Sequence, residues 1–292
     1  MKILISGANG MLARAVRERL SREHELFLTD VGEMNILKEE DIRNVCAAVC
    51  PDLILNCAAY TAVDKAEEDE AFARKLNADG PRNLAKVCLE RKIPLVSIST
   101  DFVFFGDGSH PMKEDDPTAP RGVYAVTKRE GELEIEKSGC EFLIVRTAWL
   151  YGKGGKNFPD TMIKLAKERD LLTVVSDQVG SPTYTVDLAE ALANLIAAEA
   201  RGYYHFTNRG GISWYDFACG AIEEAKNVGI IPKDKPVTVK PVGTKDFPRP
   251  APRPSYSVLS LEKYEKATGK TPPEWREALK RYLKSLGTPN KC

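Results

Sequence analysis

A tyrosine and a lysine stand four residues apart in the stretch VYAVTKREGE, at Tyr124 and Lys128. Four residues make about one turn of a helix, so both side chains leave from the same face. A free tyrosine has a pKa of about 10, and a nearby ammonium group favours the phenolate and lowers that pKa. The spacing therefore predicts either an ordinary exposed pair or a general acid, Tyr124, whose pKa is set by Lys128.

A hydroxyl and a carboxylate follow the apolar run LVSI, at Thr100 and Asp101. Such a run is typical of a strand buried on both faces, and open α/β sheets bind ligands at the carboxyl ends of their strands. Tyr124 could protonate a carbonyl oxygen while hydride reaches the carbon, and Thr100 could stabilise the charge on that oxygen. Together with Lys128 on the nicotinamide ribose, these residues predict the reduction of a carbonyl by a nicotinamide cofactor.

A glycine turn stands near the N-terminus, in ISGANGMLA. Gly7 permits a tight turn, Gly10 lets the backbone approach a pyrophosphate, and the following helix presents free N–H groups to the phosphates. Asp30 closes the next apolar run about 20 residues later, where a carboxylate accepts hydrogen bonds from the adenosine ribose and repels a 2′-phosphate. The pattern predicts a dinucleotide site with a preference for NAD over NADP, which nearby basic residues such as Arg14 soften.

Apolar runs alternate with helical periodicity through the first half of the chain. Strands are predicted at 2–6, 25–30, 53–57, 95–99 and 142–146, with helices at 12–20, 39–49, 69–91 and 124–137. This alternation predicts an α/β fold, a Rossmann-type doubly wound parallel sheet with right-handed crossovers.

The rhythm changes after residue 150, where glycine and proline become dense. Helices are predicted at 156–169, 186–200, 213–227 and 273–286, and strands at 172–175, 202–207 and 237–242. We expect residues 1–150 to form an NAD(P)-binding domain to which a segment around 183–208 returns. Residues 151–292 should form mainly a smaller α/β substrate-binding lobe.

The bulk composition argues against several classes of protein. The 292 residues carry 42 Lys plus Arg and 42 Asp plus Glu, so nothing attracts the chain to nucleic acid or to an anionic membrane. No apolar run approaches the roughly 20 residues that span a bilayer, and the N-terminus lacks the features of a signal peptide. The seven cysteines and three histidines show no metal-ligand spacing. We expect a cytoplasmic protein without a metal site.

Longer motifs connect the chain to a known family. The sequence resembles the extended short-chain dehydrogenase/reductase family, marked by Tyr-x-x-x-Lys with an upstream Ser or Thr, and within it the dTDP-4-dehydrorhamnose reductases. The matching stretches are GANGMLA, DLILNCAAYTAVDKAE, STDFVFFG, YAVTKREGE, RTAWLYGKGGKNF, DQVGSPTYTVDLA and RPSYSVL. The resemblance implies that NADPH or NADH reduces the 4-keto group of a nucleotide sugar, dTDP-4-dehydro-L-rhamnose, to give dTDP-L-rhamnose.

The resemblance also implies roles for individual residues. Gly10, Met11 and Leu12 would contact the diphosphate of the cofactor, and Asp30 its adenosine ribose. Asn35 and Ile36 would lie at the adenine end, and three residues after the third strand would line the cofactor: Ala59, Tyr60 and Thr61. Thr100 and Asp101 would contact the sugar, and Trp149 would pack on its ring. Asn77 could order the active-site helix. The stretch VDKAE could belong to the site or be an ordinary charged helix start.

A second lobe must also hold the diphosphate of such a substrate. The proline-rich stretch 248–257 offers Arg249 and Arg253, and a guanidinium group can hold a diphosphate bidentately. The same stretch could instead be a plain connection between domains. We expect Arg253 to bind the substrate.

Other interpretations of these motifs stay open. The β subunit of methionine adenosyltransferase resembles this family and keeps a dinucleotide site while binding a partner enzyme. Another nucleotide-sugar reductase or an epimerase would share the same catalytic group. Relatives that dimerise through Mg²⁺ use an acidic side chain on the first helix, where this chain has ARAV at residues 13–16. We therefore expect a monomer or a weak homodimer.

Overall fold

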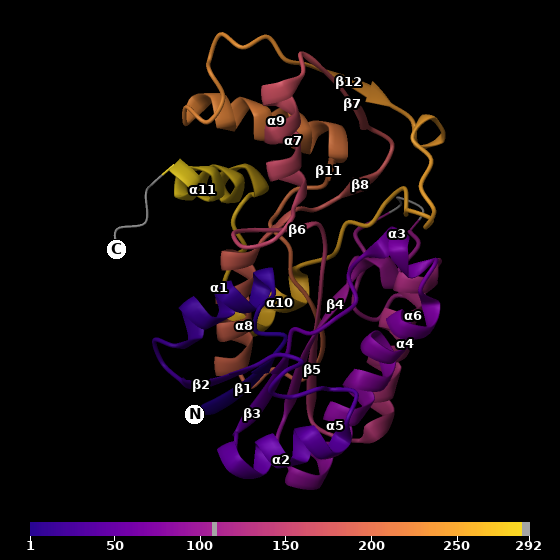
Figure 1. The fold of residues 1–292 in the computed structure, drawn as a ribbon, viewed down its shortest axis with the longest axis vertical. Helices are drawn as coiled ribbons and strands as arrows, with labels where there is room; N and C mark the ends of the chain where they lie inside the picture. Colours follow the sequence, from indigo (N-terminus) through magenta and orange to yellow (C-terminus); the bar gives the residue numbers. More distant parts are fainter. Residues whose placement is uncertain (107–109, 288–292) are drawn as a thin grey trace.

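Six parallel strands form the central sheet of the computed structural model, which describes residues 1–106 and 110–287 (Figure 1). Their order across the sheet is β10-β5-β4-β3-β1-β2. The strands are β1 (Lys2–Ser6), β2 (Glu25–Thr29), β3 (Leu53–Asn56), β4 (Leu95–Thr100), β5 (Phe142–Thr147) and β10 (Gly202–His205). The predicted fold class, a doubly wound parallel sheet, is confirmed.

Helices cover both faces of this sheet and, with it, make up the sheet lobe. They are α1 (Met11–Leu20), α2 (Glu39–Val49), α3 (Val63–Ala66), α4 (Glu70–Arg74), α5 (Gly80–Arg91), α6 (Val123–Ser138), α8 (Thr185–Ala197) and α10 (Glu262–Thr268). Successive strand residues point to opposite faces, so Ile3 and Ile5 join the core under α1 and α8, and Leu4 joins the core under α2 and α5. Burial on both faces explains why the four inner strands, β1, β3, β4 and β5, are continuous apolar runs, whereas the edge strands β2 and β10 are partly exposed.

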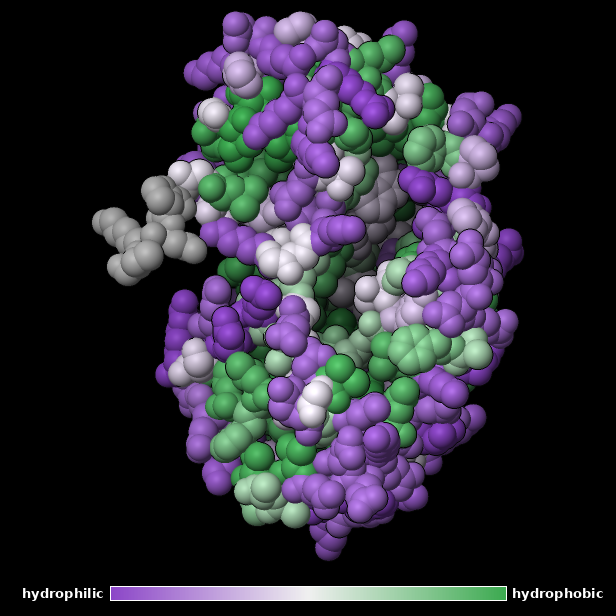
Figure 2. All heavy atoms as spheres, viewed as in Figure 1, coloured by the Kyte–Doolittle hydropathy of each residue, from purple (hydrophilic) through white to green (hydrophobic). Residues whose placement is uncertain are grey.

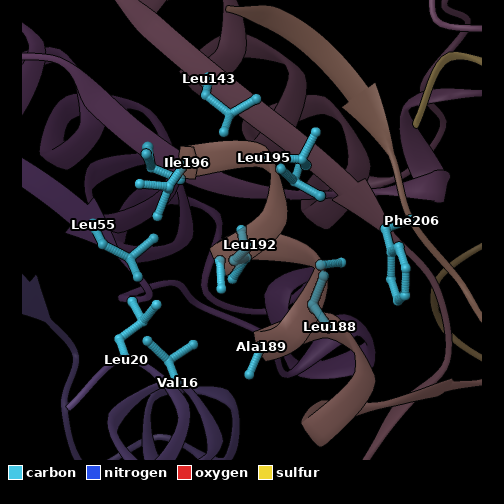
Figure 3. Packing of buried hydrophobic residues seen from close by; sticks show 14 of the residues in the cluster. Val16, Leu20, Leu55, Leu143, Leu188, Ala189, Leu192, Leu195, Ile196 and Phe206 are labelled. Atoms are coloured by element: carbon cyan, nitrogen blue, oxygen red, sulfur yellow. The ribbon is translucent and has the colours of Figure 1, made fainter. Parts of the chain in front are cut away.

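Helix α8 and strand β10, within residues 185–205, belong to the sheet lobe although they follow the first part of the second lobe. Strand β10 pairs with β5 at the edge of the sheet. Leu188 and Leu192 of α8 lie in one apolar cluster with Val16 and Leu20 of α1 (Figure 3). The chain therefore leaves the sheet after β5 and returns to complete it.

The second lobe lies above the carboxyl ends of the strands (Figure 1). Its helices are α7 (Phe158–Glu168), α9 (Trp214–Asn227) and α11 (Trp275–Gly287), and its strands are β6 (Leu150–Tyr151), β7 (Leu171–Val175), β8 (Val179–Gly180), β9 (Thr183–Tyr184), β11 (Ile212–Ser213) and β12 (Thr238–Val242). Tyr151, Phe217 and Tyr282 are fully buried in its core. No helix within the described ranges is long and apolar enough to cross a membrane.

The helix predicted over 69–91 is interrupted. A π-helical turn (Lys75–Asp79) separates α4 from α5. Gly131 of α6 packs so closely on this turn that a β-carbon there would lie 2.0 Å from the carbonyl oxygen of Asn77. A π-turn widens the helix locally and is frequent at functional sites. Hydrophobic periodicity did not reveal it, nor the short elements such as α3, β6 and β8.

Candidate active site

A cavity of about 530 Å³ lies between the two lobes. The molecular surface is hollowed there, at the level of α3 and β6 (Figure 2). Its lining comes from the glycine turn, the ends of β3, β4 and β5, the start of α6 and the second lobe. The carboxyl ends of parallel strands meet at one edge of a sheet, which is why residues far apart in the sequence gather here.

The three residues predicted to be catalytic, Thr100, Tyr124 and Lys128, all line this cavity. Tyr124 lies in the first turn of α6 and hydrogen-bonds the side chain of Thr100. The Thr100 hydroxyl donates in turn to Asp101 Oδ1 over 3.0 Å. Lys128 Nζ donates to the carbonyl oxygen of Ile98 over 2.8 Å. A phenol, a hydroxyl and an ammonium group therefore face one space.

The protonation of this group is dominated by burial. Burial raises the pKa of Tyr124 to about 12, and the Asp101 carboxylate adds to the rise while the hydrogen bond with Thr100 opposes it. Burial also lowers the pKa of Lys128 to about 8, against the opposing effect of Glu132. A lowered pKa for Tyr124 was predicted from its spacing to Lys128. That direction is wrong, because the phenolate loses more hydration than the surrounding charges restore.

Asp101 is a buried carboxyl group at the floor of the cavity. It is 2% exposed, and burial raises its pKa to about 6. The side chains of Thr100 and Ser257 hydrogen-bond this carboxyl group, yet its Oδ2 and the Ser99 hydroxyl have no well-aligned partner within residues 1–106 and 110–287. Buried polar atoms are nearly always paired, so orphaned ones at a cavity wall favour a polar ligand.

The glycine turn is tight and leaves the start of α1 without a side-chain cap. Gly7 has φ +68°, and a β-carbon there would lie 2.7 Å from the main-chain nitrogen of Ala58. Gly10 is the N-cap of α1 and has no side chain to accept from the first N–H groups of that helix. Met11 and Leu12 line the cavity next to it. A diphosphate could take the place of the missing cap.

The other predicted cofactor residues lie partly in the cavity lining and partly outside it. Ala59 and Thr61 line the cavity, whereas five others lie outside its lining: Gly7, Asp30, Asn35, Ile36 and Tyr60. The Asp30 carboxylate accepts from the N–H of Asn9 over 3.1 Å, so it sits against the glycine turn.

The remaining three have structural partners. The Ile36 side chain is only 4% exposed, and Gly80 leaves room for it. Asn35 Oδ1 accepts from the N–H of Leu37 over 3.0 Å. The main chain of Tyr60 is held by the carboxamide of Asn77, with distances of 2.8 and 3.1 Å, and the same carboxamide donates to Thr127 of α6 over 3.2 Å. Asn77 thus connects α6 to the segment that follows β3.

Two stacked tryptophans form the wall on the side of the second lobe. Trp149 lines the cavity and stacks on Trp214, with ring centroids 3.5 Å apart and planes 12° from parallel. Trp149 has φ 47°, a strained value for a residue with a large side chain, and a β-carbon on Gly180 would lie 2.7 Å from its ring. Trp214 was not predicted, because it begins a helix after an ordinary Ser213 cap.

A second cavity of about 330 Å³ continues from the first into the second lobe. Arg253 and Trp214 line both cavities, and Arg249 lines the second. Arg253 Nη2 donates to Asp64 Oδ1 over 2.9 Å, and Arg249 Nη1 lies 3.9 Å from Asp64 Oδ2. The predicted arginine therefore stands where the two spaces meet, held by a carboxylate of α3.

Known proteins of one family are similar to this chain over nearly its whole length. A protein-family model described as the RmlD substrate binding domain matches residues 1–288. The chain is 40% identical to the spore coat polysaccharide biosynthesis protein SpsK of Bacillus subtilis, over 97% of this chain and 96% of that protein.

Two crystal structures are similar throughout. A dTDP-4-dehydrorhamnose reductase from Clostridium acetobutylicum matches with a TM-score of 0.93 at 43% identity, covering 99% of this chain and 100% of that one. A dTDP-4-dehydrorhamnose reductase from Bacillus anthracis, solved in complex with NADP, matches with a TM-score of 0.91 at 37% identity, covering 97% and 98%.

Proposed function

The chain belongs to the family of the RmlD substrate binding domain, and on that premise we propose that it is an NAD(P)H-dependent reductase of a 4-keto nucleotide sugar. The specific reaction is reduction of dTDP-4-dehydro-L-rhamnose to dTDP-L-rhamnose, by analogy with the reductases from Clostridium acetobutylicum and Bacillus anthracis. The observation that carries the proposal is that Thr100, Tyr124 and Lys128 face one cavity between the lobes.

The cofactor would lie along the glycine turn. The N–H groups at the start of α1, next to Gly10, would bind its diphosphate, and Lys128 would hold the nicotinamide ribose. The bound cofactor supplies hydride. The NADP complex of the Bacillus anthracis relative favours NADPH, whereas the carboxylate of Asp30 beside the turn favours NADH.

Tyr124 would supply the proton to the 4-keto oxygen. A pKa of about 12 keeps its hydroxyl protonated at neutral pH, so the proton is in place before the oxygen becomes negative. Thr100 hydrogen-bonds the Tyr124 hydroxyl, and its own hydroxyl could donate to the same substrate oxygen in exchange for its bond to Asp101 Oδ1. Lys128 is an ammonium group one helical turn away and would stabilise the phenolate that forms.

The nucleotide would extend into the second cavity. Trp214 offers an aromatic face that lines both spaces, and Arg253 stands at their junction. A guanidinium group there could hold the diphosphate between the sugar and the base. The second cavity, of about 330 Å³, would take the base and its deoxyribose.

The test is oxidation of NADPH and NADH by the purified protein with a panel of 4-keto sugars on dTDP, UDP and GDP. We expect turnover with dTDP-4-dehydro-L-rhamnose and a product identical to dTDP-L-rhamnose by NMR. Turnover only with another sugar would keep the reductase and change the substrate. Epimerised product without net cofactor oxidation would indicate an epimerase. Cofactor binding with no reaction, and co-purification with an adenosyltransferase, would indicate the regulatory subunit.

A further inference from the structure

Helix α3 lies beside the active site, where its Val63 lines the first cavity and its Asp64 the second, but the function proposed above gives its carboxylates no task of their own. It is the VDKAE stretch of the sequence, and it carries Asp64 with Glu67 directly after it. Both carboxylates are partly buried and both make hydrogen bonds to segments that form the site.

Glu67 caps the helix that carries Tyr124. Its Oε1 accepts from the N–H of Val123, the first residue of α6, over 2.8 Å. The N-cap of α6 is Gly122, which has no side chain with which to satisfy this N–H. A carboxylate at a helix N-terminus also interacts favourably with the helix dipole. The first turn of α6, and with it Tyr124, is therefore held from outside the helix.

Gly122 packs between this cap and the proline-rich stretch 248–257 that carries Arg253. It has φ +81°, and a β-carbon there would lie 2.8 Å from Glu67 Oε1 and 2.9 Å from Cδ of Pro252. The start of α6 is thus enclosed between Glu67 and the residue that precedes Arg253. A movement of either residue would therefore displace Gly122, the residue directly before the helix begins.

Asp64 holds the other side of the site. Its Oδ1 accepts from Arg253 Nη2 over 2.9 Å and from the N–H of Ala251 over 3.3 Å. The Arg253 guanidinium lies over the ring of Phe102, 5.8 Å from its centroid, and Phe102 meets the Tyr124 ring edge to face at 5.8 Å. The arginine and the tyrosine therefore share a neighbour as well as the support of α3.

We propose that Asp64 and Glu67 are positioning residues: Glu67 orients Tyr124 through the main chain of α6, and Asp64 orients Arg253 toward the diphosphate. This inference rests on the proposed function and deepens it. The two carboxylates are three residues apart, so one short segment sets the distance between the proton donor and the diphosphate site. Neither residue lines the first cavity, so neither is expected to touch the keto group, whereas Asp64 lines the second cavity beside Arg253.

Glu67 is tested by separating its hydrogen bond from its charge. Glu67→Ala should lower kcat about 10- to 100-fold, as misplaced catalytic groups do, with an unchanged NADPH affinity. Glu67→Gln keeps an oxygen acceptor for Val123 and should retain a kcat close to that of the wild type. Glu68→Ala, at an exposed neighbour, is the control. An unchanged kcat in Glu67→Ala, or an equal loss in Glu67→Gln, would overturn the proposed role of Glu67.

A second variant removes the donor instead of the acceptor. Val123→Pro deletes the N–H, and proline is well suited to the first position of a helix. It should lower kcat as Glu67→Ala does, and the double variant should be no slower than either single one because both remove the same hydrogen bond. Additive losses would mean that Glu67 acts elsewhere and would contradict the proposal.

Asp64 is tested by calorimetric binding of dTDP, which requires no turnover. Asp64→Ala should weaken dTDP binding about tenfold, whereas Asp64→Asn, which still accepts from Arg253, should weaken it less. Unchanged binding, or tighter binding because Asp64 competes with the diphosphate, would overturn its proposed role. A wild type that binds dTDP normally but reduces no 4-keto sugar would contradict the proposed function and leave this result standing.

Discussion

The ammonium group of Lys128 hydrogen-bonds the carbonyl oxygen of Ile98, over 2.8 Å. Ile98 lies two residues before Thr100 on strand β4, so this bond ties the helix that carries Tyr124 to the strand that carries its hydroxyl partner. The lysine therefore helps to order the proposed catalytic group by this main-chain contact, in addition to any effect of its charge on Tyr124. Its 6% exposure also makes that charge sensitive to pH.

Cofactor binding is expected to weaken as the pH rises through about 8, where Lys128 loses its proton. The affinity for NADPH can be followed by fluorescence across this range. Lys128→Arg should keep its charge and give a flat profile, because the guanidinium is not deprotonated in proteins. A wild-type affinity that stays constant through this range would show that the charge of Lys128 does not contribute.

Stability should change in the opposite direction. The pKa of Lys128 is lowered from 10.5 to about 8, so the unfolded chain binds more protons than the folded one between these values. The free energy of unfolding therefore rises with pH in this window. As the pH rises through the same window, the Tm of the wild type should increase relative to the Tm of Lys128→Met. A constant difference between the two proteins would contradict the lowered pKa.

Tyr124→Phe is expected to remove the proton donor and preserve the fold. Loss of a positioned general acid typically lowers the rate about 10²–10⁴-fold. The ring keeps its edge-to-face contact with Phe102, so thermal stability and NADPH affinity should survive. Tyr215→Phe, on α9, is the matched control. A Tyr124→Phe variant with a kcat near that of the wild type on the 4-keto sugar would show that Tyr124 is not the proton donor.

Replacing Asp30 should change the preference between the cofactors. Unit charges about 4 Å apart repel by about 1 kcal/mol even in water, so removing the carboxylate should raise the kcat/KM ratio of NADPH to NADH about fivefold or more. Asp30→Asn keeps an acceptor for the N–H of Asn9, whereas Asp30→Ala also loses that contact with the glycine turn. If both variants keep the wild-type ratio, Asp30 does not face the ribose.

Arg253→Ala should weaken binding of the nucleotide sugar and leave NADPH binding intact. Hydrogen bonds to charged groups contribute about 1.5–3 kcal/mol, which corresponds to a rise in KM of roughly tenfold or more. Arg253→Lys should rescue only part of the loss, because an ammonium group cannot bind bidentately. Titration with dTDP provides the measurement. Unchanged nucleotide affinity would place the diphosphate elsewhere.

Gly131→Ala should destabilise the protein through the π-helical turn. A β-carbon would lie 2.0 Å from the carbonyl oxygen of Asn77, so main chain must move. Such overpacking costs about 1–3 kcal/mol of the free energy of unfolding, measurable with urea. Gly32→Ala is the control, since a β-carbon there meets nothing within 4 Å. Equal stability of the two variants would show that α6 can shift away without cost.

The local pattern of apolar and polar residues was sufficient to predict most of the helices and strands of the fold. The helix predicted over 39–49 begins and ends at those residues, and all six strands of the sheet overlap strands that were predicted. That Thr100, Tyr124 and Lys128 line one cavity could be predicted for the same reason. A spacing of one helical turn put Tyr124 and Lys128 on one face, and the end of an apolar run put Thr100 at the edge of the sheet.

Contacts between residues far apart in the sequence could not be predicted in this way. Arg253 and Asp64 are 189 residues apart, and the stacked Trp149 and Trp214 come from different elements, so no local period indicates either pair. The pKa of Tyr124 belongs to the same category. Its spacing to Lys128 suggested a decrease, but burial by segments distant in the sequence produced an increase. The sequence by itself determined which groups could react, because helical and strand periods are local. Only the tertiary structure decided their hydration and partners, because these depend on every segment that packs around them.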